Sequence, residues 1–145
     1  MKVALLTNEF PPDIYGGAGI HIQYLSKELR KFCSVEARAF GNQNDTEENL
    51  HALGFSKKLD LSPADSRFSK ILKPLDINLQ WAASLNDIDI LHCHTWYSHF
   101  GGVLASKLLQ KPLILTTHSL EPHRPWKAEQ LGAGGYAMST WIERT

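Results

Sequence analysis

The fold is decided by Val3-Ala4-Leu5-Leu6-Thr7-Asn8 and by the glycine-rich segment Tyr15-Gly16-Gly17-Ala18-Gly19 that follows it. A continuous apolar run of this length is typical of a strand buried on both faces, as in a parallel sheet. Pro11 and Pro12 exclude a helix between the two segments, because proline disfavours helical conformation in the residue before it. Over residues 18–31 apolar side chains recur at helical spacing. The stretch therefore predicts a strand, a glycine loop and a helix.

The same alternation continues along the chain. Strands are predicted over residues 35–40, 88–93 and 113–117, and helices over residues 74–85, 100–109 and 136–145, with Pro74 opening the first of these helices. Residues 42–50 are polar and acidic, which predicts an exposed loop, and residues 51–70 carry no clear pattern. Strands that alternate with helices predict an α/β fold: a Rossmann-like parallel sheet with flanking helices.

Composition excludes several classes of protein. The 145 residues include 15 Lys and Arg and 15 Asp and Glu, so the formal net charge is zero and no overall basic field for nucleic acid or an anionic membrane exists. Two cysteines exclude a disulfide scaffold and fit a cytoplasmic location. No apolar run approaches the roughly 20 residues of a membrane span. The length suits one domain, but it is short for an enzyme that holds two substrates between two lobes.

Three unusual loops follow predicted strands, at residues 9–19, 92–99 and 118–127. In parallel α/β sheets, ligands bind outside the carboxyl ends of the strands. The glycine loop precedes a helix, whose first N–H groups and dipole favour an anion such as phosphate. It contains neither a G-x-G-x-x-G fingerprint nor a P-loop lysine. A tight turn required only for packing is the alternative explanation of its glycines.

The second loop carries His92 and His94, which share a face of the predicted strand because they are two residues apart. Together with His118 they form a candidate zinc site, although no carboxylate is close in sequence and no H-E-x-x-H is present. The alternatives are histidines that bond a sugar hydroxyl and histidines with a purely structural role. Trp96 and Tyr97 can stack on a sugar or close the core.

The third loop is dense in charged and aromatic residues and is stiffened by two prolines. Arg124 and Lys127 are candidates to meet a phosphate, and Glu121 is a candidate to bind sugar hydroxyls. A solvated loop with internal ion pairs is the alternative.

Together these segments resemble the N-terminal domain of bacterial glycogen synthase- and maltose-1-phosphate synthase-type glycosyltransferases. These are family 4 retaining enzymes of GT-B fold. The resemblance rests on Asn8-Glu9-Phe10-Pro11-Pro12 with the glycine loop, on His92-Cys93-His94-Thr95-Trp96-Tyr97, and on Thr117-His118-Ser119-Leu120-Glu121-Pro122 continued from Arg124 to Gly132. It covers essentially the whole chain, and the third segment is the most specific.

The resemblance implies a role for each motif. Gly16 and Gly17 would approach the diphosphate of a nucleotide sugar such as ADP-glucose, and His118 would be the active-site histidine beside the anomeric carbon. The acceptor, a glucan or glucose 1-phosphate, would be lined by His94, Trp96, Tyr97, Glu121, Arg124 and Lys127. No metal or other cofactor is implied.

GT-B enzymes have a second Rossmann-like domain, which supplies the cations that neutralise the leaving diphosphate. This chain lacks it, so residues 1–145 are expected to form a partial, acceptor-side N-terminal domain that is inactive in isolation. The function implied is glucosyl transfer in glycogen or α-glucan synthesis. Two alternatives stay open: a non-catalytic phosphosugar- or glycan-binding module, and a metal-dependent hydrolase that uses His92, His94 and His118.

Overall fold

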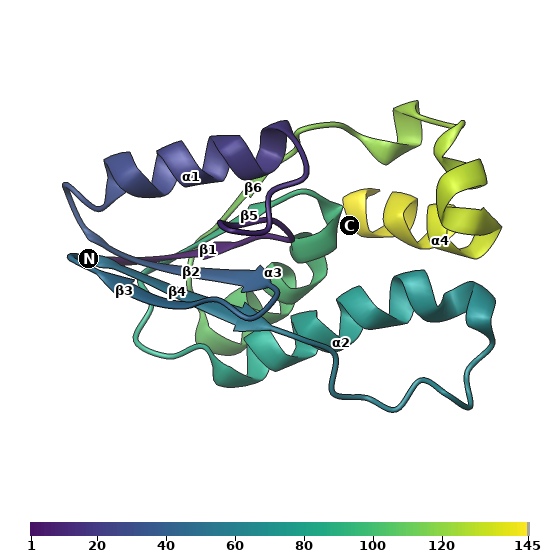
Figure 1. Ribbon diagram of the computed structural model, residues 1–145, viewed down its shortest axis with the longest axis horizontal. Helices are drawn as coiled ribbons and strands as arrows, with labels where there is room; N and C mark the ends of the chain where they lie inside the picture. The colour runs from purple at the N-terminus through teal and green to yellow at the C-terminus, as the bar shows by residue number, and fades with distance from the viewer. Residues whose placement is uncertain (145) are drawn as a thin grey trace.

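A computed structural model describes residues 1–144 and contains one six-stranded sheet (Figure 1). The strands lie in the order β3-β4-β2-β1-β5-β6. Neighbouring strands are parallel, except that β3 runs antiparallel to β4. The strands are β1 (Lys2–Leu6), β2 (Ser34–Phe40), β3 (Asn44–Glu47), β4 (Leu50–Phe55), β5 (Ile90–His94) and β6 (Leu113–Thr116). The predicted Rossmann-like α/β fold is confirmed.

Helices cover both faces of this sheet. Helix α1 (Gly17–Leu29) lies on one face, and α2 (Ser69–Ser84) and α3 (Trp96–Leu109) lie on the other (Figure 1). Helix α4 (Lys127–Arg144) lies beyond the carboxyl ends of the strands, and short 3-10 turns occupy Ser66–Phe68 and Glu121–His123. No helix within residues 1–144 is both long and apolar enough to cross a bilayer.

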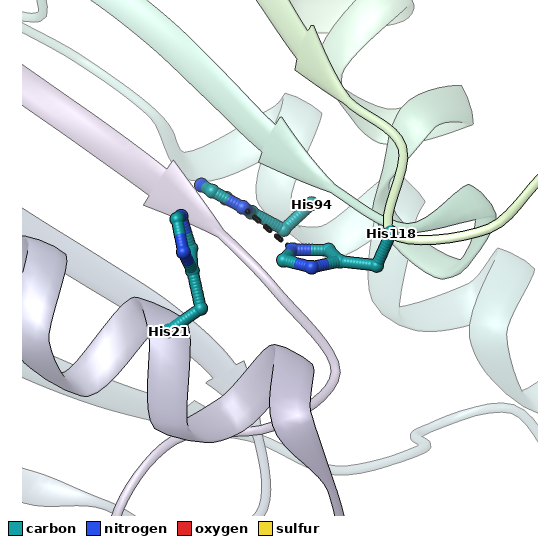
Figure 2. Close-up of side chains that lie close together, drawn as sticks. All are labelled: His21, His94 and His118. Atoms are coloured by element: carbon teal, nitrogen blue, oxygen red, sulfur yellow. Dashed lines mark hydrogen bonds between the residues drawn. The ribbon is translucent and has the colours of Figure 1, made fainter.

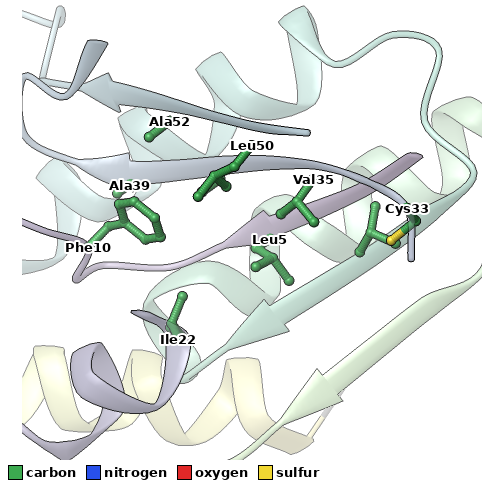
Figure 3. Close-up of a cluster of buried hydrophobic side chains, with 10 residues drawn as sticks. Leu5, Phe10, Ile22, Cys33, Val35, Ala39, Leu50 and Ala52 are labelled. Atoms are coloured by element: carbon green, nitrogen blue, oxygen red, sulfur yellow. The ribbon is translucent and has the colours of Figure 1, made fainter. Parts of the chain in front are cut away.

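The alternating side chains of the central strands fill two apolar clusters, one on each face. Leu5 and Val35 pack towards Ile22 of α1 (Figure 3). Leu6 and Leu91 belong to the opposite cluster, which includes side chains of α2. Burial on both faces explains why these strands consist of continuous apolar runs.

The exposed loop predicted for residues 42–50 is wrong in part, because Asn44–Glu47 forms β3 and Leu50 begins β4. All four residues of β3 are exposed, and they pair only with β4. Polar side chains are what an edge strand in water requires, so composition alone could not separate this strand from a loop. The strand β4 also accounts for the first part of the unassigned residues 51–70.

Three predicted helix starts are wrong. Helix α2 begins at Ser69, so Pro74 lies inside the helix rather than at its start. Helix α3 begins at Trp96, four residues before the predicted start. Helix α4 begins at Lys127 and consists of two helical parts that meet at Gly132, whose φ of 75° and ψ of 161° are not helical, so the predicted start at residue 136 falls inside the second part. The predicted end of this last helix, residue 145, is outside the described residues.

Candidate functional site

The three unusual loops converge because their strands are neighbours. The strands β1, β5 and β6 are adjacent and parallel, so the segments that leave their carboxyl ends lie at the same edge of the sheet. The turn from β5 into α3 is unusual, because Thr95 adopts a φ of 65° that residues other than glycine seldom take. Its hydroxyl donates to Asn8 Oδ1 at 3.0 Å, which ties the loop after β5 to the loop after β1.

Three imidazoles from three elements point towards one another at this edge (Figure 2). They belong to His21 on α1, His94 at the end of β5 and His118 after β6. His94 Nδ1 and His118 Nε2 are 3.2 Å apart, and one of these nitrogens donates to the other. The His21 ring lies 5.1 Å from the His118 ring and 5.6 Å from the His94 ring, measured between centroids. His94 is fully buried, whereas His21 and His118 are exposed.

The environment holds the central imidazole in its neutral form. Burial, with the neighbouring imidazoles of His92 and His118, lowers the pKa of His94 to about 3. Burial and the nearby His21 also lower the pKa of His118, against the opposing influence of Glu9. A neutral imidazole offers one nitrogen as a hydrogen-bond acceptor or metal ligand.

His92 is not part of this three-histidine group. Its Nε2 lies 2.8 Å from Thr116 Oγ1, although the centroid of its ring is only 4.2 Å from that of His94. The ligand set considered from the sequence, His92 with His94 and His118, therefore differs from the set that the fold assembles, which has His21 in place of His92. His21 was missed because it lies within a helix, outside the three strand-end loops.

The carboxylate of Glu9, for which the sequence predicted no role, contacts the glycine loop. Glu9 Oε2 accepts hydrogen bonds from the backbone N–H groups of Tyr15 and Gly16, each at 2.9 Å. The N–H of Gly16 is thus already occupied. Gly17 is the first residue of α1, so its N–H has no acceptor four residues back within the helix.

The two glycines that precede or begin α1 are not explained by packing. A Cβ built on Gly16 or Gly17 meets no atom within 4 Å in residues 1–144, and Gly16 has an extended backbone that any residue adopts. A Cβ on Gly19, in contrast, would lie 2.7 Å from Glu9 Oε2. Packing therefore accounts for Gly19, and it leaves Gly16 and Gly17 with open space in front of them.

Five of the predicted acceptor residues line one pocket of about 120 Å³ between α3, the loop after β6 and the start of α4. They are Trp96, Tyr97, Glu121, Arg124 and Lys127. Trp96 is only 4% exposed, and the Tyr97 ring stacks on it at 4.0 Å. Trp96 thus belongs to a small apolar cluster with Ile71 and Ile142 and also lines the pocket. The sixth predicted residue, His94, does not line the pocket but directly precedes Thr95, which does.

The two cations of this pocket have different partners. Arg124 donates to Ser119 Oγ at 2.8 Å and lies 3.5 Å from the Glu121 carboxylate, so its charge is largely compensated. Lys127 Nζ donates to the neutral amide oxygen of Gln130 at 2.6 Å. Lys127 is therefore the cation better able to attract an anion.

Glu121 is buried, and one carboxylate oxygen, Oε2, has no hydrogen-bond partner within the described chain. Its backbone N–H donates to Glu143 Oε2 of α4 at 2.6 Å. Burial raises the pKa of Glu143, and the nearby Glu121 charge acts in the same direction. Glu143 was missed from the sequence because only the packing of α4 reveals its position.

Comparison with known proteins identifies the family. Residues 15–144 match Glycosyltransferase Family 4. The whole chain is 42% identical to the alpha-maltose-1-phosphate synthase of Mycolicibacterium smegmatis and 41% identical to that of Mycobacterium tuberculosis, and it covers 35% of each. The sucrose-phosphate synthase structure from Thermosynechococcus elongatus has a TM-score of 0.62 at 17% identity, over 97% of this chain and 39% of that one.

The fold, the converging loops and these similarities agree with one another. The chain spans about a third of the length of its curated relatives. It belongs to glycosyltransferase family 4.

Proposed function

We propose that this chain forms the acceptor side of a site that transfers a glucosyl group from a nucleotide sugar, ADP-glucose, to a glucan or glucose 1-phosphate. The observation that carries the proposal is the pocket of Trp96, Tyr97, Glu121, Arg124 and Lys127. This pocket lies next to two of the histidines along the chain. Thr95 directly follows His94, Ser119 directly follows His118, and both Thr95 and Ser119 line the pocket. A sugar in this pocket would therefore lie beside His118.

The pocket offers the groups that a phosphosugar needs. Trp96 and Tyr97 line the pocket and offer an apolar wall to a sugar, and the buried carboxylate of Glu121, one of whose oxygens has no partner among the described residues, accepts hydrogen bonds from hydroxyls. Lys127 supplies a positive charge. Its hydrogen bond is made to the neutral amide of Gln130 and not to a carboxylate. This combination supports glucose 1-phosphate as the acceptor, and the maltose-1-phosphate synthases among the relatives support the same choice.

The donor would lie on the other side of the histidines. In this proposal Gly17 contributes its N–H to the diphosphate, and the absent side chains of Gly16 and Gly17 let the diphosphate approach the start of α1. The Glu9 carboxylate stabilises the conformation of the glycine loop by accepting hydrogen bonds from the backbone N–H groups of Tyr15 and Gly16. Departure of the nucleotide requires electrostatic stabilisation worth several kcal/mol, which the second domain of such enzymes would supply.

The acceptor assignment is tested by titrating the 145-residue chain with glucose 1-phosphate and with glucose. We expect glucose 1-phosphate to bind more tightly and Lys127→Ala to weaken its binding about tenfold, as loss of one charge-assisted hydrogen bond predicts. Arg124→Ala should have a smaller effect because Glu121 already compensates Arg124. Lys107→Ala, at an exposed position of α3, is the matched control and should change nothing. Equal affinity for glucose and glucose 1-phosphate would contradict the acceptor assignment.

The donor assignment needs a separate measurement. In an enzyme that carries this sequence together with a second Rossmann-like domain, Gly17→Ala should raise the KM for ADP-glucose and leave the acceptor KM unchanged. The isolated chain should bind glucose 1-phosphate without transferring glucose from ADP-glucose. If binding is present and the complete enzyme is also inactive, the chain is a phosphosugar-binding module instead.

A further inference from the structure

We propose that His21, His94 and His118 form a binding site for a divalent metal ion such as Zn²⁺. The three side chains each offer one nitrogen, and these nitrogens all lie within 4.8 Å of one another (Figure 2). The site is independent of the proposed sugar transfer, since it requires only the folded chain.

The geometry of two of the ligands already fits. Zn²⁺ binds imidazole nitrogen at about 2.0–2.1 Å, so two nitrogens at tetrahedral angles are about 3.3 Å apart. His94 Nδ1 and His118 Nε2 are 3.2 Å apart. To bind a metal ion, the donating imidazole would carry its proton on its other ring nitrogen instead, so that both neutral imidazoles present a lone pair to the ion.

The third ligand needs only a small adjustment. His21 is exposed on α1, so its side chain can change rotamer without disturbing the core. The exposure of His21 and His118 also leaves the fourth coordination position open to water. His94 is held in place by the surrounding core, because it is fully buried.

The chemistry of the three ligands indicates the kind of metal ion. Three imidazoles without a thiolate are the ligand type that suits Zn²⁺, Cu²⁺ or Ni²⁺ better than Mg²⁺ or Ca²⁺.

Zinc binding would also affect the proposed transfer. A His118 that ligates a metal cannot at the same time contact a sugar through that nitrogen, so Zn²⁺ should inhibit. This consequence rests on the proposed function, whereas the metal site itself does not.

The test titrates the 145-residue chain with ZnCl₂ by calorimetry. We expect one Zn²⁺ per chain and at least a tenfold loss of affinity in His21→Ala, which leaves the core intact. His123→Ala, an exposed histidine outside the group, is the matched control and should bind as the unchanged chain does. His21→Asp, which keeps a ligand atom, should bind more tightly than His21→Ala.

A second measurement uses Co²⁺, whose visible absorption is strong only in tetrahedral sites. The unchanged chain and His123→Ala should show this absorption, and His21→Ala should not. Circular dichroism of each variant confirms that it is folded. Absence of stoichiometric Zn²⁺ binding, or equal losses in His21→Ala and His123→Ala, would overturn the proposal whether or not the chain binds glucose 1-phosphate.

Discussion

The side chain of Asn78 joins α2 to α3 through hydrogen bonds, and its replacement leads to a specific prediction. It is 1% exposed and lies on α2. Its Nδ2 donates to the carbonyl groups of Pro74 and Tyr97, each at 2.7 Å, and its Oδ1 accepts from the N–H of Gly101 at 2.5 Å. Tyr97 and Gly101 are four residues apart in α3, so the amide stands between two groups that would bond to each other in a regular helix.

The predicted loss of stability follows from this inventory. Asn78→Ala removes three hydrogen bonds, two of them buried, each worth about 1 kcal/mol net, so the free energy of unfolding should fall by about 3 kcal/mol. That is a large part of the roughly 5–15 kcal/mol available to a domain. Asn78→Asp should be at least as damaging, because the carboxylate keeps the acceptor for Gly101 but faces two carbonyl oxygens with a buried charge.

Urea unfolding of the 145-residue chain, followed by circular dichroism, measures these changes. Asn86→Ala, at an exposed position after α2, is the control and should change the free energy by less than about 0.5 kcal/mol. A loss below about 1 kcal/mol in Asn78→Ala would refute the reasoning. It would mean that α3 closes its own Tyr97–Gly101 hydrogen bond and that Asn78 contributes little to holding α3 on α2.

Three further predictions concern stability and solubility. Burial opposes ionisation of Glu36, but Lys2 and Arg38 hold its pKa below the ordinary value of a glutamate side chain. The stabilisation by the Glu36 carboxylate is therefore present above that ordinary value and is lost as pH falls through the lowered pKa, so the unfolding free energies of the unchanged chain and Glu36→Gln should converge in acid. Gly102→Ala should lower the free energy of unfolding by about 1–3 kcal/mol, because its Cβ would overlap the buried cysteine sulfur of β5; an unchanged urea midpoint would contradict this. Ile114 is 47% exposed on the edge strand β6, so Ile114→Lys should reduce self-association, as light scattering against concentration would detect.

The central strands and the glycine loop were predictable from sequence because their causes are local. Leu5 and Leu6 are buried on opposite faces of β1, and a continuous apolar run is the direct consequence of that double burial. The starts of the helices were less predictable. Pro74 disfavours helical conformation in the residue before it, yet α2 continues through it because Ile71, Pro74 and Ile77 are all buried in the fold.

The candidate site also has residues that could be predicted from the sequence and residues that could not. The pocket residues from Trp96 to Lys127 were predictable as a group, since they follow adjacent strands and resemble a known family. The association of His21 with His94 and His118 was not predictable, because it joins positions more than 70 residues apart and depends on how α1 lies over the sheet. Glu9 and Glu143 were likewise hidden, because each acts on backbone N–H groups, which leave no mark in sequence.

The pocket lined by Trp96, Glu121 and Lys127 depends on packing that lies outside the two main clusters. Trp96 is buried against Ile71 of α2 and Ile142 of α4, beyond the carboxyl ends of the strands. Glu143, next to Ile142, binds the backbone N–H of Glu121 in the pocket wall, and Lys127 is the first residue of α4 itself. The two parts of α4 therefore supply both the apolar floor and the charged wall of the pocket. Since Gly132 divides α4 between Lys127 and Ile142, the backbone at Gly132 sets how the cation is placed relative to the aromatic floor.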